Sequence, residues 1–396
     1  MHPGDHAFRD QQVLDVLATA TPQPMYVEMM KECPVRSNPD GTVTLLRMAD
    51  IQTVNQHRAV RGNGHSGGGI GAYTRPLIPL DLDGPEHTRW RKVLDPLFAP
   101  KRIAHLEPQI RELADHLLDD IVGRKGADIY REWCVPLPSS IFLSIMGIPQ
   151  SDLPRFQAFV DAQLHPDPSL SRDDMFAAMD AAAKDLYGYF NDEFDRREAS
   201  NTPGDDLLGW FITVERDGER LPRQELLDLM YLLMMAGLDT VASSLACILS
   251  HLARHPERRE QLLADPSLWP SAIEELMRFE TPVQYGQRKA SVDLELPSGA
   301  VVPANTVMYA SWSAANLDPD VFEDPLNVDL TRRPNPHIVF ANGWHRCLGS
   351  HLARLELRAA LEVFHRRIPN YAIKAGVSLR YAGVARAPRE LPLVWT

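Results

Sequence analysis

One cysteine stands in the segment best suited to chemistry. Cys347 belongs to Phe340-Ala341-Asn342-Gly343-Trp344-His345-Arg346-Cys347-Leu348-Gly349, which leaves a proline-rich stretch and runs into an amphipathic helix. Unpaired N–H groups at a helix N-terminus favour thiolate over thiol, so this position predicts a lowered thiol pKa and a good metal ligand. Taken alone, Cys347 could equally be a small buried apolar residue, or a nucleophile activated by His345.

A second group of polar residues interrupts the most apolar helix expected from the sequence. Ala236-Gly237-Leu238-Asp239-Thr240 lies near the middle of that helix. An acid and a hydroxyl are not buried there without a reason. The simplest structural interpretation is that Thr240 bonds back to the Ala236 carbonyl and bends the helix slightly.

Charged pairs at helical spacing form a third group. Glu275 and Arg278 lie one turn apart, as do His87 and Arg91. Such pairs are more often solvated surface groups than parts of a site.

Taken together and in this order, these motifs resemble the cytochrome P450 family over most of the chain, from about Asp83 to Trp395. The spacing Phe-x-x-Gly-x-His-x-Cys-x-Gly is similar to the family's haem-binding segment. This resemblance implies haem b as cofactor and Cys347 as the axial thiolate ligand of the iron, which promotes cleavage of O2.

The resemblance also implies roles for the other residues. Asp239 and Thr240 would deliver protons during O2 activation, beside Ala236 and Gly237 where the helix opens. The haem propionates would be bound by His87, Arg91, Arg288 and His345, and the Cys loop would be shaped by Phe340, Gly343 and Gly349. A network that supports this loop would consist of Glu275, Arg278 and Arg332. The substrate pocket would include Val283, Gln284, Val384 and Ala385.

Two residues depart from the family pattern. Ala341 stands where the family commonly has glycine, and an alanine does not easily adopt a positive φ. Trp344 places an unusual bulk beside the Cys loop. We therefore expect the loop to be adjusted locally.

The stretch Gly62-Asn63-Gly64-His65-Ser66-Gly67 matches a dinucleotide-binding pattern only formally. It neither leaves a buried strand nor opens a helix, as that pattern requires. Residues 62–71 are instead predicted to form a mobile surface loop that acts as a substrate lid.

Hydrophobic periodicity predicts a mainly α protein with small β-sheets. We expect one domain over residues 1–396. The resemblance implies that this domain has the triangular cytochrome P450 fold. The haem would lie between the helix that carries Asp239 and the helix after Cys347. A long loop over 309–347, with one possible short helix near Ser311–Leu317, leads to the cysteine. Helices are expected at Leu106–Val122, Arg172–Arg197, Leu207–Glu215, Arg223–Arg254, Pro256–Leu263, Trp269–Phe279 and Leu348–Arg366. A hairpin is expected at Val35–Met48, and short strands within Gln287–Leu296, Ala300–Met308 and Tyr371–Trp395.

Composition narrows the function classes. The chain has 396 residues, a net charge of −12 and four widely spaced cysteines, which argues against nucleic-acid binding, a zinc site and a disulfide scaffold. Its N-terminus lacks the pattern of a signal peptide. The longest apolar run, Leu229–Leu238, is shorter than the ~20 residues of a membrane helix. We expect a cytoplasmic protein without a membrane span.

The predicted function is that of a bacterial haem-thiolate monooxygenase. It would insert one atom of O2 into a C–H bond or double bond of a largely apolar small molecule. No flavin or iron–sulfur domain is visible, so electrons would come from a separate ferredoxin and ferredoxin reductase. The ferredoxin would dock on a basic surface of Arg89, Lys92, Arg346, Arg354 and Arg358.

A haem-based sensor and a Cys347–His345 hydrolase are the alternatives. Asp239 and Thr240 disfavour the sensor, because ligand binding needs no proton delivery, and the missing orienting partner disfavours the hydrolase.

Overall fold

The helix that carries Asp239 lies at the centre of the fold. This helix, α11 (Arg223–Arg254), has the predicted bounds. Pro222 precedes it, and it ends before His255-Pro256, where the proline disfavours a helical residue. The computed structural model describes residues 15–62 and 75–396, apart from positions 168 and 217. All of the predicted lid except Gly62 lies outside the described residues.

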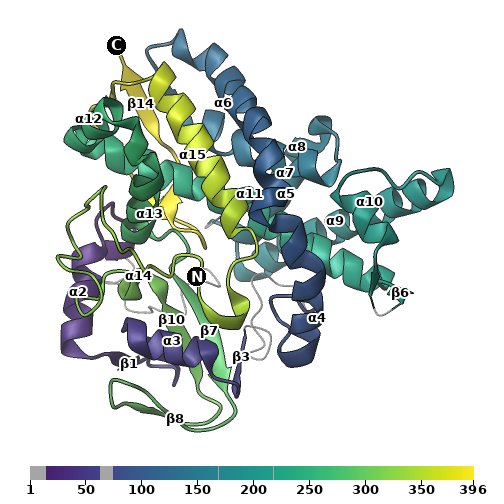
Figure 1. Cartoon of the computed structure of the whole chain (residues 1–396), viewed down its shortest axis with the longest axis horizontal. Coiled ribbons are helices and arrows are strands. Elements are labelled where there is room, and N and C mark those ends of the chain that lie inside the picture. The colour runs from purple at the N-terminus through teal and green to yellow at the C-terminus, as the bar shows by residue number, and fades with distance from the viewer. Residues whose placement is uncertain (1–14, 63–74, 168, 217) are drawn as a thin grey trace.

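Helices make up most of the described chain, as predicted (Figure 1). Helix α15 (Ser350–Arg367) follows the Cys loop and packs on α6 (Glu107–Val122), α11 and α13 (Trp269–Glu280). The other helices are α2 (Gln23–Glu32), α3 (Met48–Gln56), α4 (Gly84–Leu94), α5 (Pro100–Ile103), α7 (Pro136–Met146), α8 (Leu153–Leu164), α9 (Arg172–Ser200), α10 (Leu207–Thr213), α12 (Pro256–Ala264) and α14 (Trp312–Ala315).

A smaller β-rich region lies beside the helices and is flanked by α2 and α3 (Figure 1). Its five-stranded sheet has the order β1-β2-β10-β7-β3, in which only the β2–β10 pair is parallel. These strands are β1 (Val35–Ser37), β2 (Val43–Leu45), β3 (Val60–Arg61), β7 (Tyr285–Ala290) and β10 (Val307–Ser311). The predicted hairpin is confirmed as β1 and β2, and Gly41 turns between them with φ +80°.

The remaining strands form small pairs and a three-stranded sheet, β11-β14-β4. They are β4 (Gly126–Asp128), β5 (Glu215–Arg216), β6 (Glu219–Arg220), β8 (Leu294–Glu295), β9 (Val301–Val302), β11 (Tyr371–Ile373), β12 (Tyr381–Ala382), β13 (Ala387–Pro388) and β14 (Pro392–Trp395). The strands predicted near the C-terminus are therefore present.

The long loop before the cysteine is present, and the predicted short helix at its start is confirmed as α14. Strand β10 extends to Ser311, and α14 follows at once. The loop without strand or helix begins at Asn316 and runs to the short 3-10 helix η8 (Gly343–His345) in front of Cys347.

Helix α11 contributes to two hydrophobic clusters. Residues up to Leu238 belong to one cluster, with α7, α8 and α9, and residues from Val241 belong to another, with α13 and α15. Asp239 and Thr240 lie where the two clusters meet. Helix α11 is long and apolar enough to cross a membrane, but 83% of its apolar window is buried inside the fold, as expected of a core helix.

Candidate active site

The Cys347 loop is closed by its own backbone. The Cys347 N–H donates to the Phe340 carbonyl at 2.8 Å, and the Arg346 N–H donates to the Gly343 carbonyl. Helix α15 begins only at Ser350. The cysteine therefore precedes the helix by three residues and lies within a tight loop.

Two residues of this loop have left-handed backbone conformations. Gly343 has φ +71°, and an added Cβ would lie 2.3 Å from the Asn55 carbonyl oxygen of α3. Ala341 has φ +54°. The expectation that alanine would avoid a positive φ is therefore wrong here: the loop keeps the conformation that glycine favours, at a cost of about 1 kcal/mol. Gly349, in contrast, has φ −81°, and an added Cβ would meet only open space, so local backbone geometry does not require glycine there.

The thiol pKa also differs from the sequence-based expectation. Cys347 is accessible to solvent, yet the protein packed around its loop makes desolvation the largest influence and raises the thiol pKa. A backbone hydrogen bond from Gly349 and the charges of Arg91, Arg346 and Arg354 act in the opposite direction but do not outweigh it. The prediction of a lowered pKa is wrong for the protein alone, because desolvation outweighs the hydrogen bond and the positive charges that favour the thiolate.

A network around the Glu274 carboxylate contacts the start of the Cys loop, and no pattern in the sequence predicts it. Glu274 of α13 accepts bonds from Arg354 Nε at 2.7 Å and from His337 Nε2 at 2.8 Å. The Arg354 guanidinium in turn lies 4.3 Å above the centre of the Phe340 ring. This network therefore joins α13 and α15 to the start of the Cys loop.

The Glu274 network predicts an acid-dependent stability. Burial alone would raise the Glu274 pKa, but its bonds to His337 and Arg354 lower it to about 2. A lowered folded-state pKa stabilises the protein above the unfolded value of 4.5, and this contribution is lost as the pH falls toward 2. Glu274→Gln should lower the free energy of unfolding by roughly 2 kcal/mol at pH 7, a value that allows for partial exposure. Denaturant titrations should show the difference shrinking below pH 4.5; a difference independent of pH would contradict this assignment.

Glu275, Arg278 and Arg332 lie together in the structure. Both Glu275 oxygens accept bonds from Arg278 at 2.8 Å, and Arg332 Nε donates to Glu275 Oε2 at 3.0 Å. The Glu275 and Arg278 side chains are fully buried. Arg278 also donates to the carbonyls of Asn316 and Pro325. The network thus fixes the long loop that leads to Cys347.

The central residues of α11 divide between an accessible and a packed face. Ala236 is exposed, and Gly237 and Thr240 are partly exposed, within a helix that is otherwise largely buried. Thr240 Oγ1 donates to the Ala236 carbonyl at 2.9 Å, as the simple structural interpretation predicted. Gly237 has a packing role, since a Cβ there would lie 2.9 Å from the Phe142 ring of α7. Asp239 points to another region and accepts bonds from His165 and Arg389.

Three of the four predicted propionate contacts line one cavity of about 290 Å³, namely His87, Arg288 and His345. Arg288 is buried and donates to Asn55 Oδ1 at 2.7 Å. Desolvation lowers its pKa to about 10, and no carboxylate of the described residues forms an ion pair with it. A buried cation in this condition favours an anionic ligand group.

The other basic residues near this cavity are less suited than Arg288 to bind an anion. Desolvation, followed by the charges of His345 and Arg91, lowers the His87 pKa to about 4, so His87 is neutral at pH 7. Arg91 lies outside the cavity and binds Asp95 at 2.7 Å and the Arg346 carbonyl at 2.6 Å. A further site residue, Asp83, belongs to no pattern in the sequence that predicts its role; its carboxylate contacts His345 Nε2 at 3.1 Å.

The predicted substrate-pocket residues are only partly together. Val283 and Ala385 pair through an isolated β-bridge, and Val384 packs on the core cluster that includes α11. The amide of Gln284 is buried and donates to Tyr26 Oη of α2 at 3.0 Å. Gln284 could orient a substrate or bond within the protein by its type alone, and the structure shows the second, because α2 already engages its side chain.

The residues present fit a haem. Cys347 offers an accessible soft ligand, the exposed face of α11 leaves room for a flat group, and Arg288 offers a buried cation for a propionate. Trp344 is 58% exposed and lines the same cavity as Arg288, so its bulk points away from the core.

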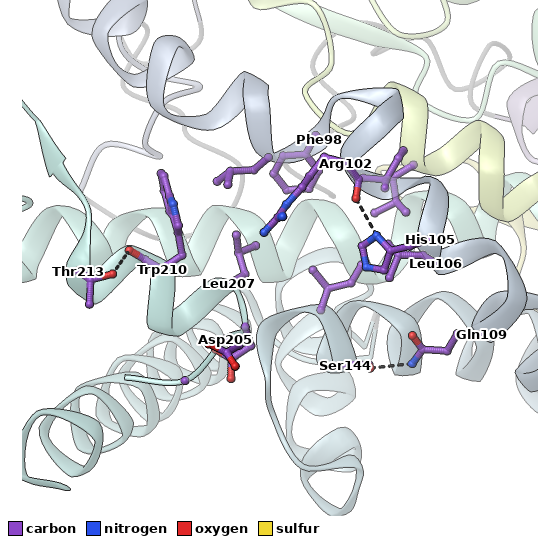
Figure 2. A pocket seen from close by; sticks show the side chains of 16 residues that line it. Phe98, Arg102, His105, Leu106, Gln109, Ser144, Asp205, Leu207, Trp210 and Thr213 are labelled. Atoms are coloured by element: carbon purple, nitrogen blue, oxygen red, sulfur yellow. Dashed lines mark hydrogen bonds between the residues drawn. The ribbon is translucent and has the colours of Figure 1, made fainter. Parts of the chain in front are cut away.

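A larger cavity, of about 660 Å³, lies apart from these residues (Figure 2). It opens between the segment 97–109 and helix α10, and Figure 2 places Arg102, Leu207 and Trp210 around it. None of the predicted site residues lines it. The size of a cavity is therefore a poor guide to the site in this protein.

Comparisons with known proteins agree with this geometry. The family model "Cytochrome P450" matches residues 35–367. The chain is 33% identical to the vitamin D(3) 25-hydroxylase of Pseudonocardia autotrophica over 90% of this chain and 88% of that protein. It is 36% identical to the mycinamicin IV hydroxylase/epoxidase of Micromonospora griseorubida over 80% and 79%, respectively.

Solved structures of cytochromes P450 also resemble this chain. A mutant of P450 EryK in complex with erythromycin B superposes with a TM-score of 0.83 at 28% identity, covering 94% of this chain and 95% of that one. CYP109E1 from Bacillus megaterium, in complex with corticosterone, has a TM-score of 0.85 at 24% identity over 95% and 98%. With an accessible cysteine in the family's loop and relatives that match over most of their length, the chain belongs to the cytochrome P450 family, the haem-thiolate monooxygenases that use O2.

Proposed function

We propose that this P450 oxidises a small, largely apolar molecule at a C–H bond or double bond, in the bacterial cytoplasm and without a membrane span. The observation that carries the proposal is the accessible patch of Ala236, Gly237 and Thr240 in the otherwise buried α11. The side chains expected around it, Val283 and Val384, are apolar. Relatives named for vitamin D3 and mycinamicin IV, and structures with erythromycin B and corticosterone, support a substrate of this class.

The bound haem would supply the redox chemistry of O2, with Cys347 as its ligand and Arg288, His87 and His345 near its propionates. The protein's own residues would manage protons and position the substrate. Thr240 Oγ1 is held at the Ala236 carbonyl, where a hydroxyl can both accept and donate a proton. Asp239, the neighbouring acid, lies buried behind it. We infer that Thr240 and Asp239 supply the protons that O2 reduction requires.

Thr240→Ala tests this assignment. The variant should bind haem and substrate and accept electrons nearly as the wild type does, because the axial ligand is untouched. Oxidised product per electron consumed should fall by about tenfold, with the remaining electrons recovered as hydrogen peroxide. Donor consumption, peroxide and product are measured together, with a substrate selected by spectral binding from steroids and macrolides. A variant as well coupled as the wild type would limit Thr240 to a helix-bending role.

Electrons are proposed to come from a ferredoxin that docks on the basic surface defined above. The basic residues of this surface differ in their ion pairs. Arg89, Arg354 and Arg358 are paired with Glu86, Glu274 and Glu107, respectively. Lys92 and Arg346 are exposed, and Arg91 joins α4 to the Arg346 carbonyl. We therefore expect Lys92 and Arg346 to provide most of the attraction.

Lys92→Glu tests the docking site without touching the Cys loop. Reduction by a plant-type ferredoxin at low salt should slow by about tenfold, and the difference from wild type should shrink as salt rises. Lys184→Glu, at an exposed lysine of α9, serves as the control and should have little effect. Equal slowing by both variants, or no salt dependence, would argue against this surface.

A further inference from the structure

Asp239 lies in a polar cluster whose other members have no part in the function proposed above. The Asp239 side chain is 3% exposed. Its Oδ1 accepts one bond from His165 Nε2 at 2.9 Å and one from Arg389 Nη1 at 3.1 Å. Ser243 Oγ lies 3.5 Å from Oδ2. The acid of α11 is therefore held from two directions by cationic or ionisable groups.

Arg389 is the fixed partner of this acid. Its guanidinium also contacts Tyr130 Oη and donates to the carbonyls of Ala382 and Ala385. Gly383 leaves the space for it, since an added Cβ there would overlap the guanidinium. Arginine stays protonated at any pH a protein experiences, so Arg389 can balance the charge of Asp239 but cannot supply a proton.

Asp239 itself holds no proton at neutral pH. Burial disfavours its charge, but the neighbouring Arg389 and His165 outweigh burial and lower its pKa. A carboxylate in this condition can deliver a proton only after receiving one from another group. Among the described side chains that contact Asp239, His165 has a ring with one nitrogen that can take up a proton and a second that can release one.

The geometry of His165 suits such an exchange. It caps the C-terminus of α8 and is followed by Pro166, which fixes the end of the helix. A carboxylate only accepts hydrogen bonds, so the contact with Asp239 assigns the proton of a neutral ring to Nε2. The opposite nitrogen, Nδ1, is buried and has no hydrogen-bond partner in the described part of the chain.

A cavity connects this histidine to the surface. It has a volume of about 630 Å³ and is lined by His165, Asp239 and Arg389 at its inner end and by Arg131 and Asp161 on the exposed side. Gln157 and Tyr130 also line it. The charged and titratable groups that face His165 are thus Asp161, Asp239, Arg389, Arg131 and Tyr130.

We propose that His165 is the proton-entry residue for Asp239, a positioning and relay residue that acts through that acid. The His165 side chain is 15% exposed, and when the ring moves to bring Nδ1 to the cavity, this nitrogen takes a proton from solvent and the Nε2 proton passes to Asp239 Oδ1. The ring is then neutral again, with its proton on Nδ1, and exchange with solvent restores the starting tautomer. No electron transfer is involved. The proposal rests on the proposed function, in which Asp239 supplies protons for O2 reduction.

A second buried histidine provides a control within the same chain. His251 Nδ1 contacts Glu280 Oε1 at 2.8 Å, which resembles the His165–Asp239 pair. Its side chain is fully buried, and Arg258 Nη1 occupies its other nitrogen at 2.8 Å. His251 therefore has a carboxylate partner but no route for a proton.

Nuclear magnetic resonance of isotope-labelled histidine tests the relay in the haem-loaded, reduced, carbon monoxide-bound protein. The His165 signal is identified by its loss in His165→Gln. We expect the Nε2–H tautomer, a signal that changes in Asp239→Asn, and exchange with solvent at least about tenfold faster than for His251. A proton fixed on Nδ1, or exchange as slow as that of His251, would overturn the proposal.

His165→Gln tests the same relay in turnover, because glutamine keeps a donor for Asp239 but does not pass a proton on. Oxygen consumption driven by NADPH, a plant-type ferredoxin and its reductase should fall by about tenfold, and the solvent deuterium isotope effect on this rate should rise. His116→Gln, at an exposed histidine of α6, should behave as the wild type. A His165→Gln protein with the wild-type rate and isotope effect would overturn the relay. A wild-type protein without a thiolate-type carbon monoxide spectrum would instead overturn the proposed function, while the resonance experiment still decides the state of His165.

Discussion

Replacing Cys347 with serine is expected to abolish thiolate ligation and O2-dependent turnover. A serine hydroxyl is a far poorer ligand for haem iron than a thiolate. The backbone bond between Cys347 and Phe340 does not involve the sulfur, so the loop should remain folded. The absorption spectrum of the reduced, carbon monoxide-bound variant and its product formation measure the effect.

Cys33→Ser provides the matched control for this variant. Cys33 is also a free, exposed cysteine, but it lies just after α2 and far from the loop in sequence. The control should keep the wild-type spectrum and activity. A Cys347→Ser protein that did the same would show that another residue binds the iron.

Glu275→Gln is expected to have the largest effect on stability. It leaves the buried Arg278 and the mostly buried Arg332 without their shared carboxylate. Breaking a buried ion pair in this way costs about 3–5 kcal/mol. Glu275 also accepts bonds from the Asp329 N–H and the Asn335 amide, so the long loop should loosen and haem retention should fall.

The control for this variant is Glu28→Gln, which removes a carboxylate from a pair with the same spacing on α2. Glu28 and Lys31 are 66% and 61% exposed, and such pairs contribute about 0–1 kcal/mol. Denaturant unfolding of both variants measures the difference. Equal losses of stability would mean that the Glu275 network does not support the loop.

Local patterns in the sequence predict much of the fold. Helix α11 has its predicted bounds, because a long apolar run is delimited by Pro222 and Pro256. Helices α7 and α8 are not among the predicted helices. Helix α7 is apolar on most sides and has prolines in its first turn, so its sequence shows no amphipathic period, and only the surrounding helices explain its burial.

The site is predictable only where a motif carries its own spacing. Cys347, Asp239 and Glu275 lie in such motifs. Other contacts of the site join distant parts of the chain: Arg389 is 150 residues from Asp239, and Arg354 is 80 residues from Glu274. No local pattern encodes such contacts, because tertiary packing determines them. For the same reason the sequence does not show that the amide of Gln284, a residue that the resemblance places in the substrate pocket, binds Tyr26 in the folded protein.

The absorption spectrum of the reduced protein with carbon monoxide shows directly which group binds the haem iron. We expect Cys347 to bind the iron as a thiolate, in a loop held by the Glu274 and Glu275 networks. The Soret band should lie at the long wavelength that marks thiolate ligation, and it should be retained in Cys33→Ser and lost in Cys347→Ser. A Soret band only at the shorter wavelength of a nitrogen-ligated haem, or no Soret band after reconstitution with haem, would contradict it.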